Sequence, residues 1–176
     1  MKLLHVFGAC LILCLLIPCQ SCQTVDDNRI PNMPVNISIG DIGMWNTYGV
    51  SGFGNNRNFI LTSSGTRIPA DFPFTTTSAT GFGGVLLIEG LDTYTSSVSV
   101  PLAYDLACPV ERQPDVRVRV NPETYYAECP VCESVYDVTM GAGGPVKGIA
   151  ATGNYKYGLK QYRAIATGNG GYFITN

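Results

Sequence analysis

Three cysteines in the second half of the chain have the residue type and spacing to do chemistry. Cys108 lies in residues 107–111, which read ACPVE, and Cys129 and Cys132 lie in residues 128–134, which read ECPVCES. Thiolates are ligands of zinc and of iron–sulfur clusters. Two short cysteine turns close together in the sequence are typical of loops that hold a group between them.

The residues behind the second turn follow an order that resembles the Rieske iron–sulfur domain. Ser134 and Tyr136 come directly after the turn, glycines gather at 141–144, and residues 148–150 read GIA. The family has Cys-x-His and Cys-x-x-His boxes, then Gly-Ser-x-Tyr and a Gly-Pro-Ala lid over a [2Fe–2S] centre. The resemblance covers roughly residues 84–176.

The resemblance implies both a fold and a set of site residues. Cys108 and Cys129 match the family's two cysteines, while Ser134 and Tyr136 match the hydroxyls that bond to cluster and cysteine sulfurs. The implied fold is all-β, a Rieske-like stack of small antiparallel sheets with long Gly/Thr-rich loops.

The departures from the family fall on the metal ligands. Val110 stands at the first histidine position and Cys132 at the second, and the only histidine of the chain is His5. A Rieske centre needs two imidazoles, so we expect no cofactor. Two alternatives stay open: a degenerate [2Fe–2S] electron carrier, or a metal site, using Cys108, Cys129 and Cys132. A carboxylate, either Glu111 or Glu133, would complete such a site.

The resemblance also implies a disulfide. In the family, the cysteines that match Cys108 and Cys129 coordinate the same iron, so their sulfurs lie close together. Without iron we therefore expect a Cys108–Cys129 disulfide bond. Cys132 would then remain as a buried thiol beside Val110. Bonds from Cys132 to Cys108 or to Cys129 are the alternatives.

The N-terminal segment has the pattern of a bacterial lipoprotein signal. Lys2 precedes an apolar run over residues 3–17, which is short for a membrane-spanning helix. Ser21 before Cys22 predicts a signal peptide over residues 1–21 and lipidation of Cys22, with Cys19 as the rival site and an ordinary secretory signal as the alternative.

The remaining chain then divides into a polar tether, residues 22–34, and a single domain, residues 35–176. Residues 49–84 are rich in glycine and read either as a hairpin with long loops or as an insertion. Apolar or alternating runs predict strands, and no run predicts a helix of three turns. The predicted strands include 35–39, 58–61, 84–88, 97–104 and 116–120.

Composition limits the classes of function. A net charge of −2 without a basic cluster argues against nucleic acid as a partner. Membrane attachment would come from the lipid alone, on the periplasmic or outer-membrane face of a bacterial cell envelope. With His5 the only histidine, no Ser/His/Asp or Cys/His catalytic set exists. We therefore expect a non-enzymatic, cluster-less binding or structural module, whose protein or small-molecule partner the sequence does not identify.

Overall fold

The computed structural model describes residues 25–92, 97–140, 142–153 and 156–176. The expected signal peptide and the lipidation site Cys22 lie outside the described residues. Within those ranges, no helix has the length and apolar character needed to cross a membrane.

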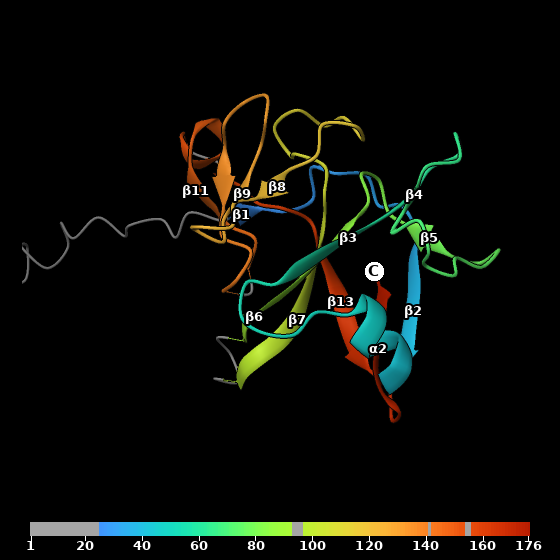
Figure 1. Cartoon of the computed structure of the whole chain (residues 1–176). Coiled ribbons are helices and arrows are strands. Elements are labelled where there is room, and N and C mark those ends of the chain that lie inside the picture. The colour runs from blue at the N-terminus through green and yellow to red at the C-terminus, as the bar shows by residue number, and fades with distance from the viewer. Residues whose placement is uncertain (1–24, 93–96, 141, 154–155) are drawn as a thin grey trace, which may run out of the picture.

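In the part of the chain that the structure describes, the strands form three β-sheets (Figure 1). The largest has eight strands in the order β4-β3-β6-β7-β13-β14-β2-β5 and curls into a half-barrel. A four-stranded antiparallel sheet, β11-β10-β9-β8, lies at the opposite end from helix α2, and β1 pairs with β12 in parallel. The bounds of the large sheet are β2 Val35–Asp41, β3 Asn56–Leu61, β4 Arg67–Ile68, β5 Ala79–Thr80, β6 Val85–Asp92, β7 Ser97–Asp105, β13 Gln161–Ala166 and β14 Gly170–Thr175. The remaining elements are β1 Val25–Asp26, α2 Ile42–Tyr48, β8 Arg119–Val120, β9 Ala127–Glu128, β10 Val135–Tyr136, β11 Pro145–Lys147, the 3-10 helix η1 Ile149–Ala151 and β12 Lys156–Tyr157.

Strand β6 separates two hydrophobic cores because it is buried on both faces. Its side chains alternate between the two sides, as in any strand. Val85 and Leu87 pack inside the curled sheet, while Leu86 and Ile88 pack toward the four-stranded sheet. A strand that is buried on both faces needs a continuous run of apolar residues. This is why residues 84–88 could be predicted as a strand from the sequence.

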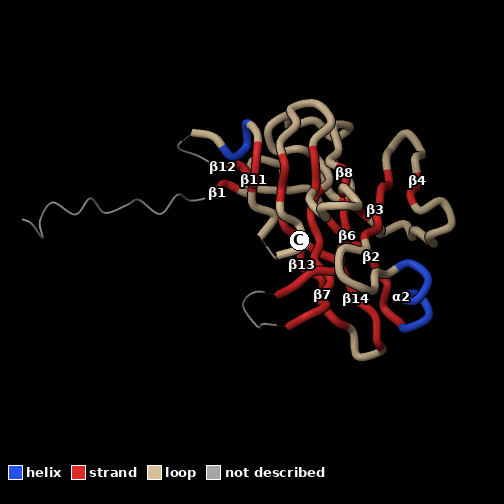
Figure 2. The backbone as a smooth tube through the Cα atoms, turned by 60° about the vertical axis from the view of Figure 1, so that its left-hand side comes forward, coloured by secondary structure: helices blue, strands red, loops and turns tan. Residues whose placement is uncertain are grey.

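The core between the two sheets carries the cysteines. It includes Tyr104 of β7, Ala127 of β9 and Tyr136 of β10, together with Cys108 and Cys129. The second core fills the half-barrel and is closed by side chains of α2. The cysteine turns are therefore anchored in the core that the two sheets share. Figure 2 shows β11 and β8 of the small sheet above β7 and β14 of the large sheet.

Helix α2 was not expected from the sequence. Asp41 caps its start, because the Asp41 carboxylate accepts a hydrogen bond of 2.9 Å from the Met44 N–H. The helix has only seven residues, which is too short for a periodic apolar pattern. Trp45 and Tyr48 pack it onto the core of the half-barrel.

The all-β fold class is confirmed, with one predicted strand largely wrong. Of residues 116–120, only Arg119–Val120 forms a regular strand, as β8. Val118 is buried as expected, but Arg117 is half-buried rather than solvated, and its guanidinium Nε donates to the Gly83 carbonyl oxygen. Val116 and Val120 are only half-buried, and Arg117 pairs with Ala107 through an isolated antiparallel bridge rather than a continuous ladder.

Candidate metal centre

Each cysteine turn is a tight backbone turn that starts from a buried cysteine of the core. In the first turn the Arg112 N–H donates to the Cys108 carbonyl oxygen at 2.8 Å, and in the second the Glu133 N–H donates to the Cys129 carbonyl oxygen at 3.1 Å. Arg112 and Glu133 both have a φ of 56°, the left-handed conformation that ends such a turn.

Backbone hydrogen bonds to nearby loop residues fix where the turns begin. The Cys108 N–H donates to the Val116 carbonyl oxygen at 3.0 Å, in the loop that follows β7. The Cys129 N–H donates to the Ser134 carbonyl oxygen at 2.9 Å, between β9 and β10. The large sheet supplies one turn and the small sheet supplies the other.

The three sulfurs meet at one point. The Sγ atoms of Cys108, Cys129 and Cys132 all lie within 4.8 Å of one another. Cys108 Sγ and Cys132 Sγ are 3.6 Å apart. Cys108 and Cys129 are buried and Cys132 is half-buried, so the group opens toward the surface on the Cys132 side.

Hydroxyl groups surround the sulfurs. Tyr136 Oη lies 3.4 Å from Cys108 Sγ, and Ser134 Oγ lies 3.3 Å from Cys132 Sγ. Ser134 Oγ also accepts a hydrogen bond of 3.1 Å from the Ala150 N–H. The structure thus brings together all five residues that the sequence singled out.

Burial sets the electrostatics of Cys108 and Tyr136. Burial raises the pKa of the Cys108 thiol to about 12, against hydrogen bonds from Tyr136 and from the backbone N–H groups of Glu111 and Val110, which favour the thiolate. Burial, with the neighbouring Cys108, also raises the pKa of Tyr136 above its ordinary value. The Tyr136 hydroxyl therefore stays protonated and can donate a hydrogen bond to a thiolate.

The expected Cys108–Cys129 disulfide is not formed, and this expectation is corrected. Cys108, Cys129 and Cys132 are all free thiols. A disulfide requires sulfurs about 2.05 Å apart, and Cys108 Sγ instead contacts Cys132 Sγ without a bond, at 3.6 Å. Cys132, expected as a buried spare thiol, is instead half-buried and joins the group as a third member.

The ligand set does not fit a Rieske centre. Such a centre needs two imidazoles on its second iron, and the described residues contain no histidine. Val110, at the first histidine position, is a half-buried aliphatic side chain that packs against the core.

Residues 148–150, here called the lid, pack against Ser134, whose hydroxyl contacts Cys132 Sγ. Gly148 leads into η1, with a φ of 86°, and a Cβ built on it would lie 2.7 Å from Ser134 Cα. Only glycine permits so close an approach. The sequence singled out the same three residues, although the exposed Ile149 stands where the resemblance places proline.

Sequence reasoning missed Asp105, which supports the first turn. Its carboxylate is fully buried, and its Oδ1 accepts the Ala107 N–H at 2.7 Å. Phe82 and Gly83 donate their N–H groups to the same carboxylate. An acidic residue at the end of an apolar run, two positions before a cysteine turn, is the signal that could have found it.

Comparisons with known proteins add no relative to this picture. No family model matches the chain, and the comparisons with curated proteins and with solved structures give no match either.

Proposed function

We propose that this protein binds a single soft metal ion through the thiolates of Cys108, Cys129 and Cys132. The observation that carries the proposal is the gathering of the three sulfurs within 4.8 Å of one another. Zinc–thiolate bonds of about 2.3 Å place two sulfurs of one tetrahedral ion about 3.8 Å apart. The Cys108–Cys132 separation of 3.6 Å needs only a small adjustment to meet that value.

One ion fits the group better than a binuclear cluster. A [2Fe–2S] cluster takes four protein ligands, two on each iron. Here three sulfurs converge on one point, and none is set apart to hold a second iron. Thiolate-rich sites select Zn²⁺ and Cu(I) among single ions, so these are the ions that the group favours.

The surroundings also suit a thiolate site. Tyr136 and Ser134 place hydroxyls against the sulfurs of Cys108 and Cys132, and such groups orient metal ligands and tune their basicity. The backbone N–H groups of Val110 and Glu111 approach Cys108 and favour its thiolate.

The wider setting that we propose is a cell-envelope lipoprotein anchored through Cys22, with a Rieske-like domain that has exchanged its histidine ligands. The two features that support it are the apolar N-terminal run ending at Ser21-Cys22 and the order of cysteine turns, hydroxyls and glycine lid. In this setting the domain is a metal-binding module, without enzyme activity of its own.

A metal titration tests the proposal. The full chain, purified in mild detergent under reducing conditions, is titrated with Zn²⁺, Co²⁺ and Cu(I), and bound metal is counted by elemental analysis and native mass spectrometry. We expect one ion per chain and sulfur-to-cobalt charge-transfer absorption.

Serine variants identify the ligands. Cys108→Ser, Cys129→Ser and Cys132→Ser should each weaken binding strongly. Ser64→Ala, in an exposed turn outside the group, is the control and should bind as the wild type does. Equal binding by all four variants would show that the metal does not sit among these three sulfurs.

A further inference from the structure

The two cysteine turns repeat one backbone design. Residues 108–112 and 129–133 both begin with Cys-Pro-Val. In both, the fifth residue donates its N–H to the carbonyl oxygen of the first cysteine and has a φ of 56°. Superposing one turn on the other therefore matches Cys108 to Cys129. The next four residues of the two turns then match one to one.

This superposition identifies the residue of the first turn that is equivalent to Cys132. The fourth residue of the second turn is Cys132, and the fourth residue of the first turn is Glu111. Because the two backbones take the same course, the Cα–Cβ bond of Glu111 leaves its turn in the same direction, relative to Cys108, as that of Cys132 relative to Cys129. Cys132 uses this direction to reach the sulfur group.

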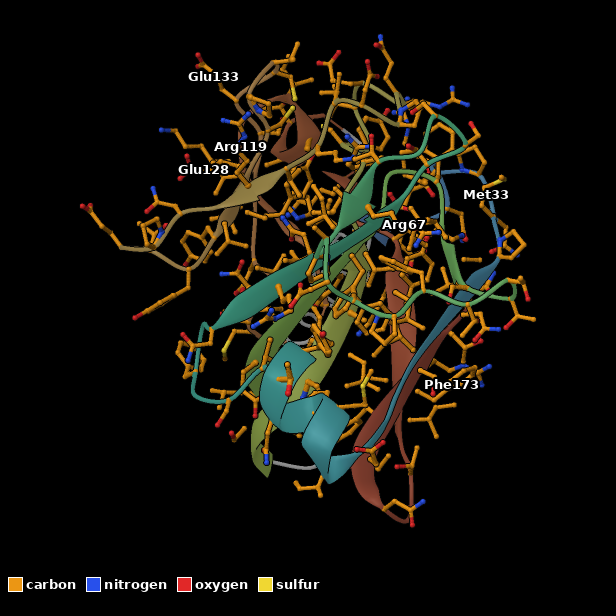
Figure 3. The ribbon with its side chains drawn as sticks, turned by 45° about the vertical axis from the view of Figure 1, so that its right-hand side comes forward. Met33, Arg67, Arg119, Glu128, Glu133 and Phe173 are labelled. Atoms are coloured by element: carbon orange, nitrogen blue, oxygen red, sulfur yellow. The ribbon has the colours of Figure 1, made fainter. Side chains whose placement is uncertain are left out.

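Residues at equivalent positions of the two turns are also buried to a similar extent. Glu111 is half-buried, as Cys132 is, while the two fifth residues, Arg112 and Glu133, are exposed. Figure 3 shows Glu133 at the periphery, pointing away from the sheets. Of the two carboxylates beside the thiols, Glu111 occupies the ligand position of its turn and Glu133 does not.

We propose that the Glu111 carboxylate is the fourth ligand of the site and that the ion is Zn²⁺. This inference rests on the proposed function of the three thiols. The Glu111 carboxylate lies outside the 4.8 Å group, so binding the ion requires rotation about its side-chain bonds. Zn²⁺ accepts a carboxylate oxygen beside thiolates and is commonly four-coordinate. Cu(I) prefers soft thiolate ligands and gains little from a carboxylate.

The two turns then form a pair of metal-binding knuckles, each supplying its first and fourth residues. Cys108 and Glu111 come from the turn on the large sheet, and Cys129 and Cys132 come from the turn on the small sheet. An ion held in this way ties the two sheets together, because each sheet supplies half of its ligands.

The test compares glutamate variants in the full chain, purified in mild detergent under reducing conditions. Zn²⁺ affinity is measured by competition with a chromophoric chelator, and Co²⁺ spectra report the coordination. Glu111→Gln, which keeps the size of the side chain, should weaken Zn²⁺ and Co²⁺ binding at least about tenfold, the lower end of the effect for groups that merely support a ligand. Glu133→Gln, which removes a neighbouring exposed charge, is the matched control and should bind as the wild type does.

Two further measurements identify the ion and the geometry. Glu111→Gln should leave Cu(I) affinity unchanged, and Glu111→Cys should bind Zn²⁺ more tightly than the wild type, with a Co²⁺ spectrum of four thiolates. Equal Zn²⁺ affinity in wild type, Glu111→Gln and Glu133→Gln would overturn Glu111 as a ligand while leaving the three-thiolate site in place. Failure of the wild type to bind any metal would instead overturn the proposed function itself.

Discussion

The Tyr162 hydroxyl donates a hydrogen bond of 2.6 Å to Asp105 Oδ2, which joins β13 to the end of β7. The same buried carboxylate accepts the Ala107 N–H, one residue before Cys108. The contact therefore connects the large sheet to the start of the first cysteine turn, through a carboxylate that water does not reach.

Removing this hydroxyl with Tyr162→Phe should lower the free energy of unfolding at neutral pH by about 1.5–3 kcal/mol, the usual range for a hydrogen bond to a charged group. Burial raises the pKa of Asp105, while the Tyr162 hydroxyl and three backbone N–H groups act to lower it. Without the hydroxyl, the pKa of Asp105 rises further in the folded state.

The sign of the pH dependence follows from that rise. A raised folded-state pKa gives stability that is fully present below the unfolded value of about 3.9 and is lost as the pH rises through the folded value. The difference between Tyr162→Phe and the wild type should therefore be small near pH 3.5 and grow toward pH 7. Urea unfolding at both pH values measures it, with Tyr125→Phe, on an exposed side chain, as control. A difference that shrinks as the pH rises would contradict this account.

Ser134→Ala should destabilise the packing of the lid, residues 148–150, against the second cysteine turn. The change removes the oxygen that accepts the Ala150 N–H at 3.1 Å, and Ala150 is fully buried. An unpaired buried N–H costs about 1–3 kcal/mol. Chemical denaturation reports the loss, and hydrogen exchange should show faster exchange at Ala150. Ser64→Ala, in an exposed turn, should leave both measurements as in the wild type.

Gly148→Ala should destabilise the protein more than alanine at two other glycines. Gly148 combines a φ of 86° with a Cβ position 2.7 Å from Ser134 Cα. Gly153 has a φ of 90° but open space around it, and Gly144 has neither constraint. Backbone strain of this kind costs about 1–3 kcal/mol, so the expected order of destabilisation is Gly148, then Gly153, then Gly144. Thermal unfolding of the three variants measures this order. Equal melting temperatures would show that the lid accommodates the added methyl group without loss of stability.

The sequence predicts the composition of the site better than its geometry. The two Cys-Pro-Val turns, Ser134 and Tyr136 can be grouped because their order along the chain is distinctive. Cys132 shows the limit: spacing alone does not reveal whether its sulfur points to Cys108, because that depends on the left-handed turn at Glu133. Asp105 is harder still, since its hydrogen-bond donors lie on segments distant in sequence.

Local patterns predict the fold where burial is periodic and fail where elements are short. Val35, Ile37 and Ile39 are buried and alternate with more exposed neighbours, so β2 is legible as a strand. Helix α2 depends on a single capping carboxylate, from Asp41, and on its fit against the half-barrel. The order of the eight strands depends on pairings between distant segments, such as β2 with β14, which no local pattern contains.

Tyr136→Phe should weaken metal binding while leaving the fold nearly unchanged. Tyr136 is fully buried and its Oη lies 3.4 Å from Cys108 Sγ. A neutral thiol is a weak hydrogen-bond partner, so the unloaded protein loses little when the hydroxyl is removed and the ring remains. A thiolate on a metal gains far more from a donor, and loss of such a supporting group typically costs about 10–100-fold in metal affinity. Chelator competition with Zn²⁺ and thermal unfolding without added metal separate the two effects. A variant that binds Zn²⁺ as tightly as the wild type, or one that loses stability and affinity together, would mean that Tyr136 serves packing alone.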